Sequence, residues 1–125
     1  MVQIVQYLKI HNTLSRQKEE FKPLDSEHIK IYACGPTVYN YAHIGNARMA
    51  VVFDSLVRLL RFLYPKVTYV SNITDIDDKI IDAANKLNVS FKDITEKYAD
   101  IYNQDMAKLG VHIPDVQPKA TEYIP

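Results

Sequence analysis

Residues 34–48 contain the amino acids of this chain whose types and spacing best suit them to bind a phosphate. His43 and Asn46 stand three residues apart, so on the first turn of a helix their side chains share one side. Both can donate hydrogen bonds, and Gly45 would let a ligand come close to the backbone. Unpaired N–H groups and the helix dipole favour an anion at a helix start. These residues therefore predict contacts to phosphate oxygens.

A helix start of this kind also occurs without any ligand. Polar residues are common on the first helical turn, where they satisfy backbone groups of the chain itself. The sequence contains neither a Walker loop nor a G-x-G-x-x-G pattern, so the common phosphate fingerprints give no independent support. On these residues alone, an ordinary polar helix start is favoured over a phosphate site.

Two strands and a long helix must position this segment. Apolar and polar residues alternate over residues 29–34 and predict a strand that ends at the Gly35–Pro36 break, because a proline disfavours helix at the preceding residue. Apolar residues at three- and four-residue steps predict a helix from about His43 to Leu63, which Pro65 ends. A β-branched and aromatic run over residues 66–72 predicts a second strand. This order predicts a βαβ unit with a parallel sheet, an α/β nucleotide-binding architecture.

At the amino-terminal end the sequence predicts one more strand followed by a turn, and over the last fifteen residues it predicts little regular structure. Tyr7 to Leu14 alternate well enough for a strand, and a charged turn over Ser15 to Glu20 and an extended link over residues 21–25 follow. Residues 111–118 are punctuated by prolines. Because a self-contained doubly wound domain usually has more strands than these, residues 1–125 are expected to be the amino-terminal part of a larger α/β enzyme.

Two further helices are predicted after the second strand, from about Asp77 to Leu87 and from about Phe91 to Leu109. Ser90 followed by Asp93 resembles a capping box, and Gly110 suits the end of the last helix. An apolar stripe on that helix is expected to pack in the core and consists of Phe91, Ile94, Tyr98, Ile101 and Leu109.

Composition limits the class of protein. The chain has 125 residues, 47% hydrophobic and 24% charged, with a formal net charge of +0. These values favour one globular domain or one lobe of a larger protein and argue against a disordered chain, and the charge balance excludes a globally basic nucleic-acid surface. No apolar run approaches the roughly 20 residues of a membrane-spanning helix, and the start does not resemble a secretory signal. A single cysteine, Cys34, excludes an internal disulfide and fits a reducing, cytoplasmic compartment.

The segment around His43 resembles the H-I-G-H signature of class I aminoacyl-tRNA synthetases. With its surroundings, the chain is similar to the cysteinyl-tRNA synthetase family, because matching segments follow in the family's order at residues 13–23, 32–39, 43–48, 72–81 and 118–122. The resemblance spans nearly the whole chain and implies the first part of a catalytic domain. The implied fold is a Rossmann-like, HUP-type parallel sheet with flanking helices.

The resemblance implies a two-step reaction. Cysteine would attack the α-phosphate of ATP to give cysteinyl-adenylate and pyrophosphate, and the cysteinyl group would then pass to the terminal ribose of tRNA(Cys). His43 and Asn46 match the residues that hold ATP phosphates as charge builds on the leaving pyrophosphate. Asn46 replaces the second histidine of the signature, so it keeps a donor but cannot become cationic. The ATP-binding residues implied are Pro36, Thr37, His43, Gly45 and Asn46.

The resemblance also implies a cysteine pocket and a zinc ion. Gly35, Thr37 and Thr74 would line the pocket, although Thr74 could equally be an ordinary strand residue. A lone cysteine on a strand is usually a small buried apolar residue. In the family, however, the residue that matches Cys34 ligates zinc, which binds the substrate thiolate and so discriminates against serine. The other ligands are expected beyond residue 125, so this chain alone is expected to hold zinc weakly or not at all.

Other polar residues have ordinary interpretations. His11, His28 and His112 are scattered and are expected to be solvated surface residues. Asp75, Asp77 and Asp78 could hold magnesium, but a cap at the start of the next helix is the preferred interpretation. Tyr39 and Tyr41 could stack on a ligand, but tyrosine is also common in half-buried loops.

The implied partners are tRNA(Cys), cysteine and ATP with Mg²⁺, for a monomer without membrane contact. Two alternatives stay open. A mycothiol-pathway cysteine ligase would share the activation step and acylate an amino sugar instead. The chain could also be a catalytically incompetent nucleotide-binding fragment, because it lacks the family's second signature, of the Lys-Met-Ser-Lys-Ser type.

Overall fold

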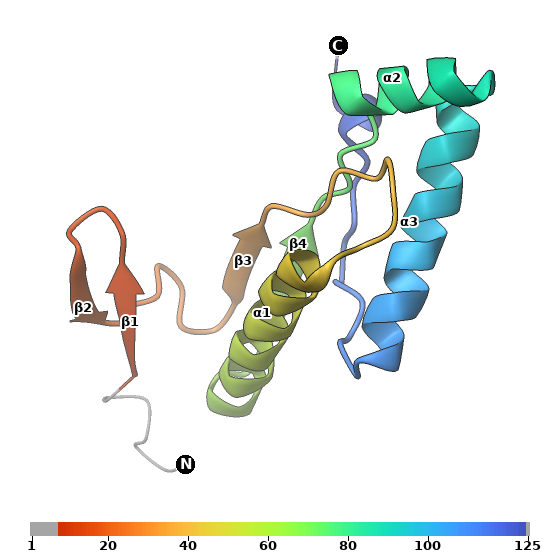
Figure 1. Ribbon diagram of the computed structural model, residues 1–125. Helices are drawn as coiled ribbons and strands as arrows, with labels where there is room; N and C mark the ends of the chain where they lie inside the picture. The colour runs from red at the N-terminus through yellow and green to blue at the C-terminus, as the bar shows by residue number, and fades with distance from the viewer. Residues whose placement is uncertain (1–7, 125) are drawn as a thin grey trace.

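The computed structural model describes residues 8–124. These residues form two small sheets, three α-helices and a short 3-10 helix (Figure 1): β1 (Lys9–Asn12), β2 (Gln17–Glu20), β3 (Ile29–Ala33), α1 (Ile44–Leu63), β4 (Val67–Ser71), α2 (Asp78–Leu87), α3 (Phe91–Lys108) and the 3-10 helix η2 (Ala120–Glu122). The mixed α/β class is the expected one. Tyr7, where the first predicted strand begins, lies outside the described residues.

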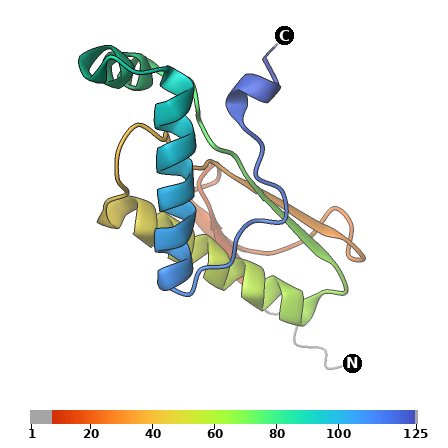
Figure 2. The same cartoon turned by 90° about the vertical axis from the view of Figure 1, so that its right-hand side faces the viewer.

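The unit β3–α1–β4 is the centre of the fold. β3 and β4 pair in parallel, with Ile29 opposite Val67 and Ala33 opposite Ser71. Alternate residues of both strands turn toward α1, which lies along one face of this sheet (Figure 2). Two clusters of buried residues form the contact between the sheet and α1. One is Ile29 with Leu60 and Tyr64, and the other is Ala33 with Val57 and Tyr69. The predicted βαβ unit with a parallel sheet is therefore confirmed.

A third extended segment, residues 116–119, lies against the other edge of β4. The Ser71 N–H donates to the carbonyl of Val116 at 3.1 Å, and the Ile73 N–H donates to the carbonyl of Pro118 at 2.8 Å. Both bridges to this segment are parallel. The sequence predicted only a proline-rich stretch here, because prolines weaken a strand pattern. At the edge of a sheet one proline is tolerated: Pro118 offers no N–H to β4, but its carbonyl accepts from the Ile73 N–H, and the N–H groups of Val116 and Ala120 donate to the carbonyls of Tyr69 and Ile73.

Residues 17–20 correct a second prediction. They were expected in a charged turn but form β2, which pairs antiparallel with β1 so that Lys9 lies opposite Glu20 and Asn12 opposite Gln17. The turn is confined to residues 13–16, where Arg16 adopts a φ of 57°. Every residue of β2 is exposed, so no apolar alternation marks it as a strand. Backbone pairing holds it instead, together with a hydrogen bond of 3.1 Å that the Asn12 Nδ2 donates to the Oε2 of Glu19.

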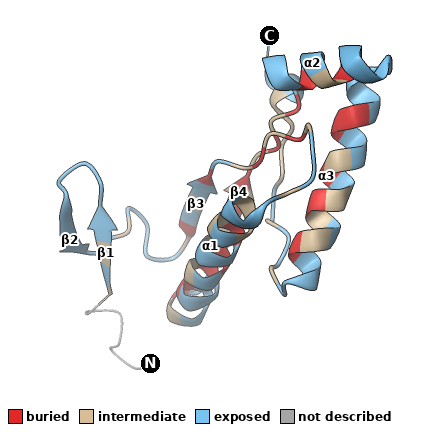
Figure 3. Cartoon of the chain, in the orientation of Figure 1, coloured by how far each residue is buried: buried red, intermediate tan, exposed pale blue. Residues whose placement is uncertain are grey.

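Helices α2 and α3 connect β4 to the third segment. The Ser90 hydroxyl caps α3 by accepting from the Lys92 N–H at 3.2 Å, and Gly110, at φ 77°, follows its end. The predicted core stripe is partly wrong, because Phe91 and Leu109 are exposed at the ends of α3 (Figure 3). One face of the helix packs against the loop before α1, the start of α1 and the loop after β4, and its buried residues are Ile94, Thr95, Ala99, Tyr102 and Met106.

A buried carboxylate fixes the chain between α3 and the third segment. Asp54 on α1 is only 7% exposed and accepts from the Arg58 Nε at 2.7 Å and from the His112 N–H at 3.1 Å.

The three histidines that were expected at the surface differ in exposure. His112 and His11 are exposed as predicted, but His28 is half-buried and shares a 2.7 Å hydrogen bond with Thr68. Within residues 8–124, no helix combines the length and apolar character that crossing a bilayer requires.

Candidate functional site

The start of α1 is built by a reciprocal pair of side chains. His43 is the N-cap residue, and its Nδ1 accepts a hydrogen bond from the Gly45 N–H at 3.0 Å. In return, the Oδ1 of Asn46 accepts from the His43 N–H at 3.1 Å. Two backbone donors that a helix start leaves without partners are thereby satisfied. The sequence folds locally in this way because the two side chains are three residues apart.

These two bonds determine what the site can offer a ligand. A neutral imidazole whose Nδ1 accepts must carry its proton on Nε2, so the free nitrogen of His43 is a donor. The acceptor of Asn46 is likewise in use, which leaves its Nδ2 amide protons free. Both side chains therefore present only donors beyond the helix. Such an arrangement suits an anion better than any group that must itself donate.

Gly45 serves this start in a way the sequence did not indicate. A Cβ at this position would lie 2.7 Å from the Cε1 of His43, so a larger residue would push the imidazole out of its capping position. Gly45 itself is exposed and does not line the cavity described next. Its predicted role, close approach of a ligand to the backbone, stays a prediction.

A cavity of about 190 Å³ opens beside the start of α1. Its walls are the loop of residues 36–42, with Pro36 and Thr37, together with His43, Asn46, Lys79 and Tyr102. Burial raises the pKa of the Tyr102 hydroxyl, and the nearby Tyr69 adds a smaller effect in the same direction. Tyr102 therefore stays neutral at pH 7 and adds no negative charge to the cavity.

The three residues predicted for one pocket do lie together, at the carboxyl ends of β3 and β4. Thr37 and Thr74 face each other across a parallel bridge. The Gly35 N–H donates to the Oδ1 of Asn72 at 2.9 Å, and the Asn72 Nδ2 donates to the Oγ1 of Thr74 at 3.2 Å. Asn72, which sequence reasoning did not single out, thus links Gly35 to Thr74. Only Thr37 of the predicted three also lines the cavity.

Position 35 requires glycine because the backbone after β3 comes very close to the backbone after β4. A Cβ there would lie 1.5 Å from the carbonyl oxygen of Asn72, which is backbone and cannot rotate away. The loop after β3 can therefore cross the loop after β4 only with glycine at this position. The crossing brings Thr37 opposite Thr74 one step further on.

Cys34 lies immediately after β3 and is exposed, so the interpretation as a buried apolar residue is wrong. Its thiol is available to a ligand at the carboxyl edge of the sheet. Across residues 8–124, no three histidine, cysteine or acidic side chains gather as a metal site. Cys34 could thus contribute one soft sulfur ligand, with the others coming from elsewhere.

The acidic residues near α2 have structural partners. The Oδ1 of Asp77 accepts from the Lys79 N–H at 2.9 Å, which confirms the predicted cap. Asp75 is buried and accepts from the N–H and the hydroxyl of Thr121 at 2.9 and 2.6 Å. This contact fixes η2 beside the loop after β4. The carboxylates of Asp75 and Asp77 are therefore used within the protein.

Two aromatic residues and one lysine complete the surroundings of the cavity. Tyr41 packs edge-on against Tyr98 with ring centroids 5.3 Å apart, and the Nζ of Lys79 lies 5.5 Å from the centroid of the Tyr39 ring. Sequence reasoning found no phosphate-binding lysine. A signal was present, because Lys79 stands on the first turn of a helix that follows a parallel strand, where ligands often bind.

Comparison with known proteins gives the family. A family model described as the class I (C) tRNA synthetase catalytic domain matches residues 20–125. A cysteine–tRNA ligase of Parvibaculum lavamentivorans is 61% identical over 117 residues, which are 94% of this chain and 25% of that protein. Cysteine–tRNA ligases of Rhodospirillum rubrum and of Wolbachia pipientis subsp. Culex pipiens are each 56% identical over 94% of this chain and cover 26% and 25% of their own lengths. The chain spans about a quarter of these relatives, and it belongs to the family of class I (C) tRNA synthetase catalytic domains.

Proposed function

We propose that this chain forms the ATP-binding, amino-terminal part of a cysteine–tRNA ligase. The observation that carries the proposal is the start of α1, where His43 and Asn46 present only donors to a cavity. The names of the relatives supply the amino acid and the tRNA. The proposed partners are cysteine, ATP with Mg²⁺ and tRNA(Cys), for a monomer in the cytoplasm.

In the proposed first step, a carboxylate oxygen of cysteine attacks the α-phosphorus of ATP. The bond from that phosphorus to the bridging oxygen breaks, and pyrophosphate leaves with the electron pair. Negative charge grows on the leaving oxygens, where the Nε2–H of His43 and the Nδ2 of Asn46 donate hydrogen bonds. Donors already held in place stabilise this charge without reorganising, which lowers the barrier. In the second step, the terminal ribose hydroxyl of tRNA(Cys) takes the cysteinyl group and AMP leaves.

The residues at the carboxyl ends of β3 and β4 are proposed to bind the amino acid. Gly35, Thr37 and Thr74 lie within one hydrogen-bonded crossing, and Thr37 also lines the cavity beside His43. Pro36 and Thr37 would thus stand between the phosphates and the cysteine. This placement agrees with the general position of ligands at the carboxyl ends of parallel strands.

Cys34 is proposed to ligate zinc together with a cysteine, a histidine and an acidic residue beyond residue 125. Its exposed thiol is a suitable soft ligand, and bound zinc would hold the thiolate of the substrate. The test needs a chimera in which this chain replaces the matched 117-residue segment of the Parvibaculum lavamentivorans relative. Cys34→Ser is expected to reduce its zinc content at least about tenfold by mass spectrometry, because a hydroxyl is a poor zinc ligand.

The matched control is His11→Ala, which removes an exposed imidazole on the hairpin, far from Cys34 in the chain. This variant should keep the zinc content of the unsubstituted chimera. Equal zinc in the Cys34→Ser chimera would remove Cys34 from the ligand set and leave the nucleotide proposal standing.

Cysteine-dependent exchange of labelled pyrophosphate into ATP tests the proposed function. The chimera should exchange label with cysteine and acylate tRNA(Cys), whereas the 125-residue chain alone should be severely impaired. A chimera that folds but exchanges no label with cysteine, while the parent relative does, would reject the proposal. A chimera that acylates an amino sugar instead of tRNA(Cys) would move it to the mycothiol-type ligase.

A further inference from the structure

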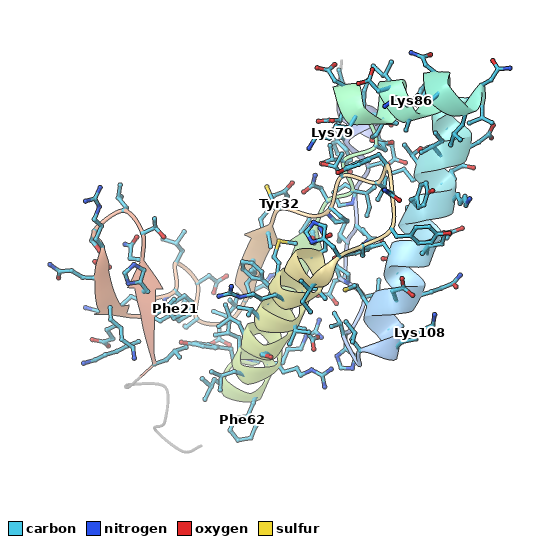
Figure 4. The ribbon with its side chains drawn as sticks, viewed as in Figure 1. Phe21, Tyr32, Phe62, Lys79, Lys86 and Lys108 are labelled. Carbon is cyan, nitrogen blue, oxygen red and sulfur yellow. The ribbon has the colours of Figure 1, made fainter. Side chains whose placement is uncertain are left out.

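We propose that Lys79 supplies the positive charge of the cavity and that its ammonium group contacts phosphate oxygens of the bound nucleotide. This inference rests on the proposed function and adds a residue to it. Lys79 lies on α2, a different element from the one that carries His43 and Asn46, yet all three side chains line the same cavity. Figure 4 labels Lys79 at the start of α2, close to the loop before α1.

The first turn of α2 fixes where Lys79 starts. Asp77 caps the helix by accepting from the Lys79 N–H at 2.9 Å, so the lysine backbone is held at the second helical position. From there its ammonium reaches a point 5.5 Å from the centroid of the Tyr39 ring. An aromatic face at this distance attracts a cation, so Tyr39 favours the conformation in which the ammonium stays beside the cavity.

The ammonium group of Lys79 is not paired with a carboxylate in the described part of the chain. Within residues 8–124, three lysine or arginine ion pairs and a contact between His112 and Asp54 join side chains at 4.0 Å or less, and Lys79 is in none of them. Asp77 and Asp78 are its acidic neighbours in sequence, and Asp77 is occupied as the helix cap. Lys79 is also exposed, so its ammonium can reach an incoming anion.

The cavity needs this charge if a triphosphate is to bind. With Nδ1 accepting from the backbone, His43 is a neutral donor, and Asn46 is an uncharged amide. Without Lys79, these two donors would meet several negative charges with no formal positive charge. Hydrogen bonds from a charged donor to phosphate are roughly twice as strong as those between neutral groups. Lys79 is therefore the side chain of this cavity that matches the charge of the ligand.

Titration of the chimera, which carries this chain and each of its variants, with ATP and with adenosine, followed by calorimetry, tests the inference. Lys79→Met is expected to weaken ATP binding about tenfold, which corresponds to about 1.4 kcal/mol, and to make it less sensitive to salt. Adenosine, which has no phosphate, should bind the variant and the unsubstituted chimera alike. Lys79→Arg keeps the charge and should retain most of the affinity.

Lys86→Met is the matched control, because Lys86 is exposed on the same helix but does not line the cavity (Figure 4). It should bind ATP like the unsubstituted chimera. Thermal unfolding should show that Lys79→Met and a second neutral variant, Lys79→Gln, remain folded. If the chimera binds ATP and both neutral variants bind it equally well, the inference is wrong and the proposed function stands. If the unsubstituted chimera folds but has no affinity for ATP, the proposed function fails, and Lys79 loses its role with it.

Discussion

His43→Asn in the chimera is expected to lower the rate constant of cysteine-dependent ATP–pyrophosphate exchange by about 100-fold to 1000-fold, with little change in stability. Asparagine is among the best N-cap residues, so it can accept from the Gly45 N–H in place of the imidazole. Its shorter side chain has no counterpart to the Nε2–H that faces the cavity. The variant therefore removes the donor and keeps the cap.

His43→Ala separates the two roles of this residue. It removes the cap as well as the donor, and should cost about 1 kcal/mol of unfolding free energy beyond the loss of activity. Urea unfolding and the exchange assay measure the two effects independently. A chimera with His43→Asn that unfolds easily but keeps its activity per folded molecule would show that the imidazole serves only to pack the helix start.

The unit that carries His43 could be predicted from sequence because its signals are local. The helix α1 begins after a capping residue and ends before Pro65, and both strands beside it have apolar or β-branched runs. The parallel pairing follows from the strand–helix–strand order. The carboxyl-end rule then places Thr37 and Thr74 at the same edge of the sheet, where the structure has them as partners in one bridge.

The elements that sequence missed are held by partners distant in the chain. β2 has no buried residue, and residues 116–119 contain a proline, so neither has the apolar alternation of a strand. Both are extended because the backbone of a neighbouring segment, β1 or β4, offers hydrogen bonds. Such pairing depends on the tertiary fold and leaves almost no trace in the local sequence.

Lys79 could not be assigned to the cavity for a related reason. Its local sequence indicates only the first turn of a helix capped by Asp77. Its place beside His43 depends on how the start of α2 lies against the loop of residues 36–42. Asn72 is similar, because its side chain matters through contacts with Gly35, which is 37 residues away in the chain. Both residues become functional candidates only when two loops are brought together.

The crossing of those loops leads to the second large effect, expected for Gly35→Ala. The new Cβ would lie 1.5 Å from the carbonyl oxygen and 2.7 Å from the carbonyl carbon of Asn72, so one of the two backbones must move. A forced backbone shift of this kind should cost about 3 kcal/mol or more of the unfolding free energy, measured by urea denaturation. Because Asn72 also holds Thr74, the shift should weaken cysteine binding in whatever protein remains folded.

Gly110→Ala is the matched control for this prediction, because the two glycines are constrained for different reasons. Gly110 has a φ of 77°, and nothing lies within 4 Å of where its Cβ would be, so alanine there meets only backbone strain of about 1 kcal/mol. Gly35 has the steric conflict without the positive φ. If alanine proves no more costly at position 35 than at position 110, the loops after β3 and β4 can separate easily. A crossing that loose could not hold Thr37 and Thr74 in register as an amino-acid pocket.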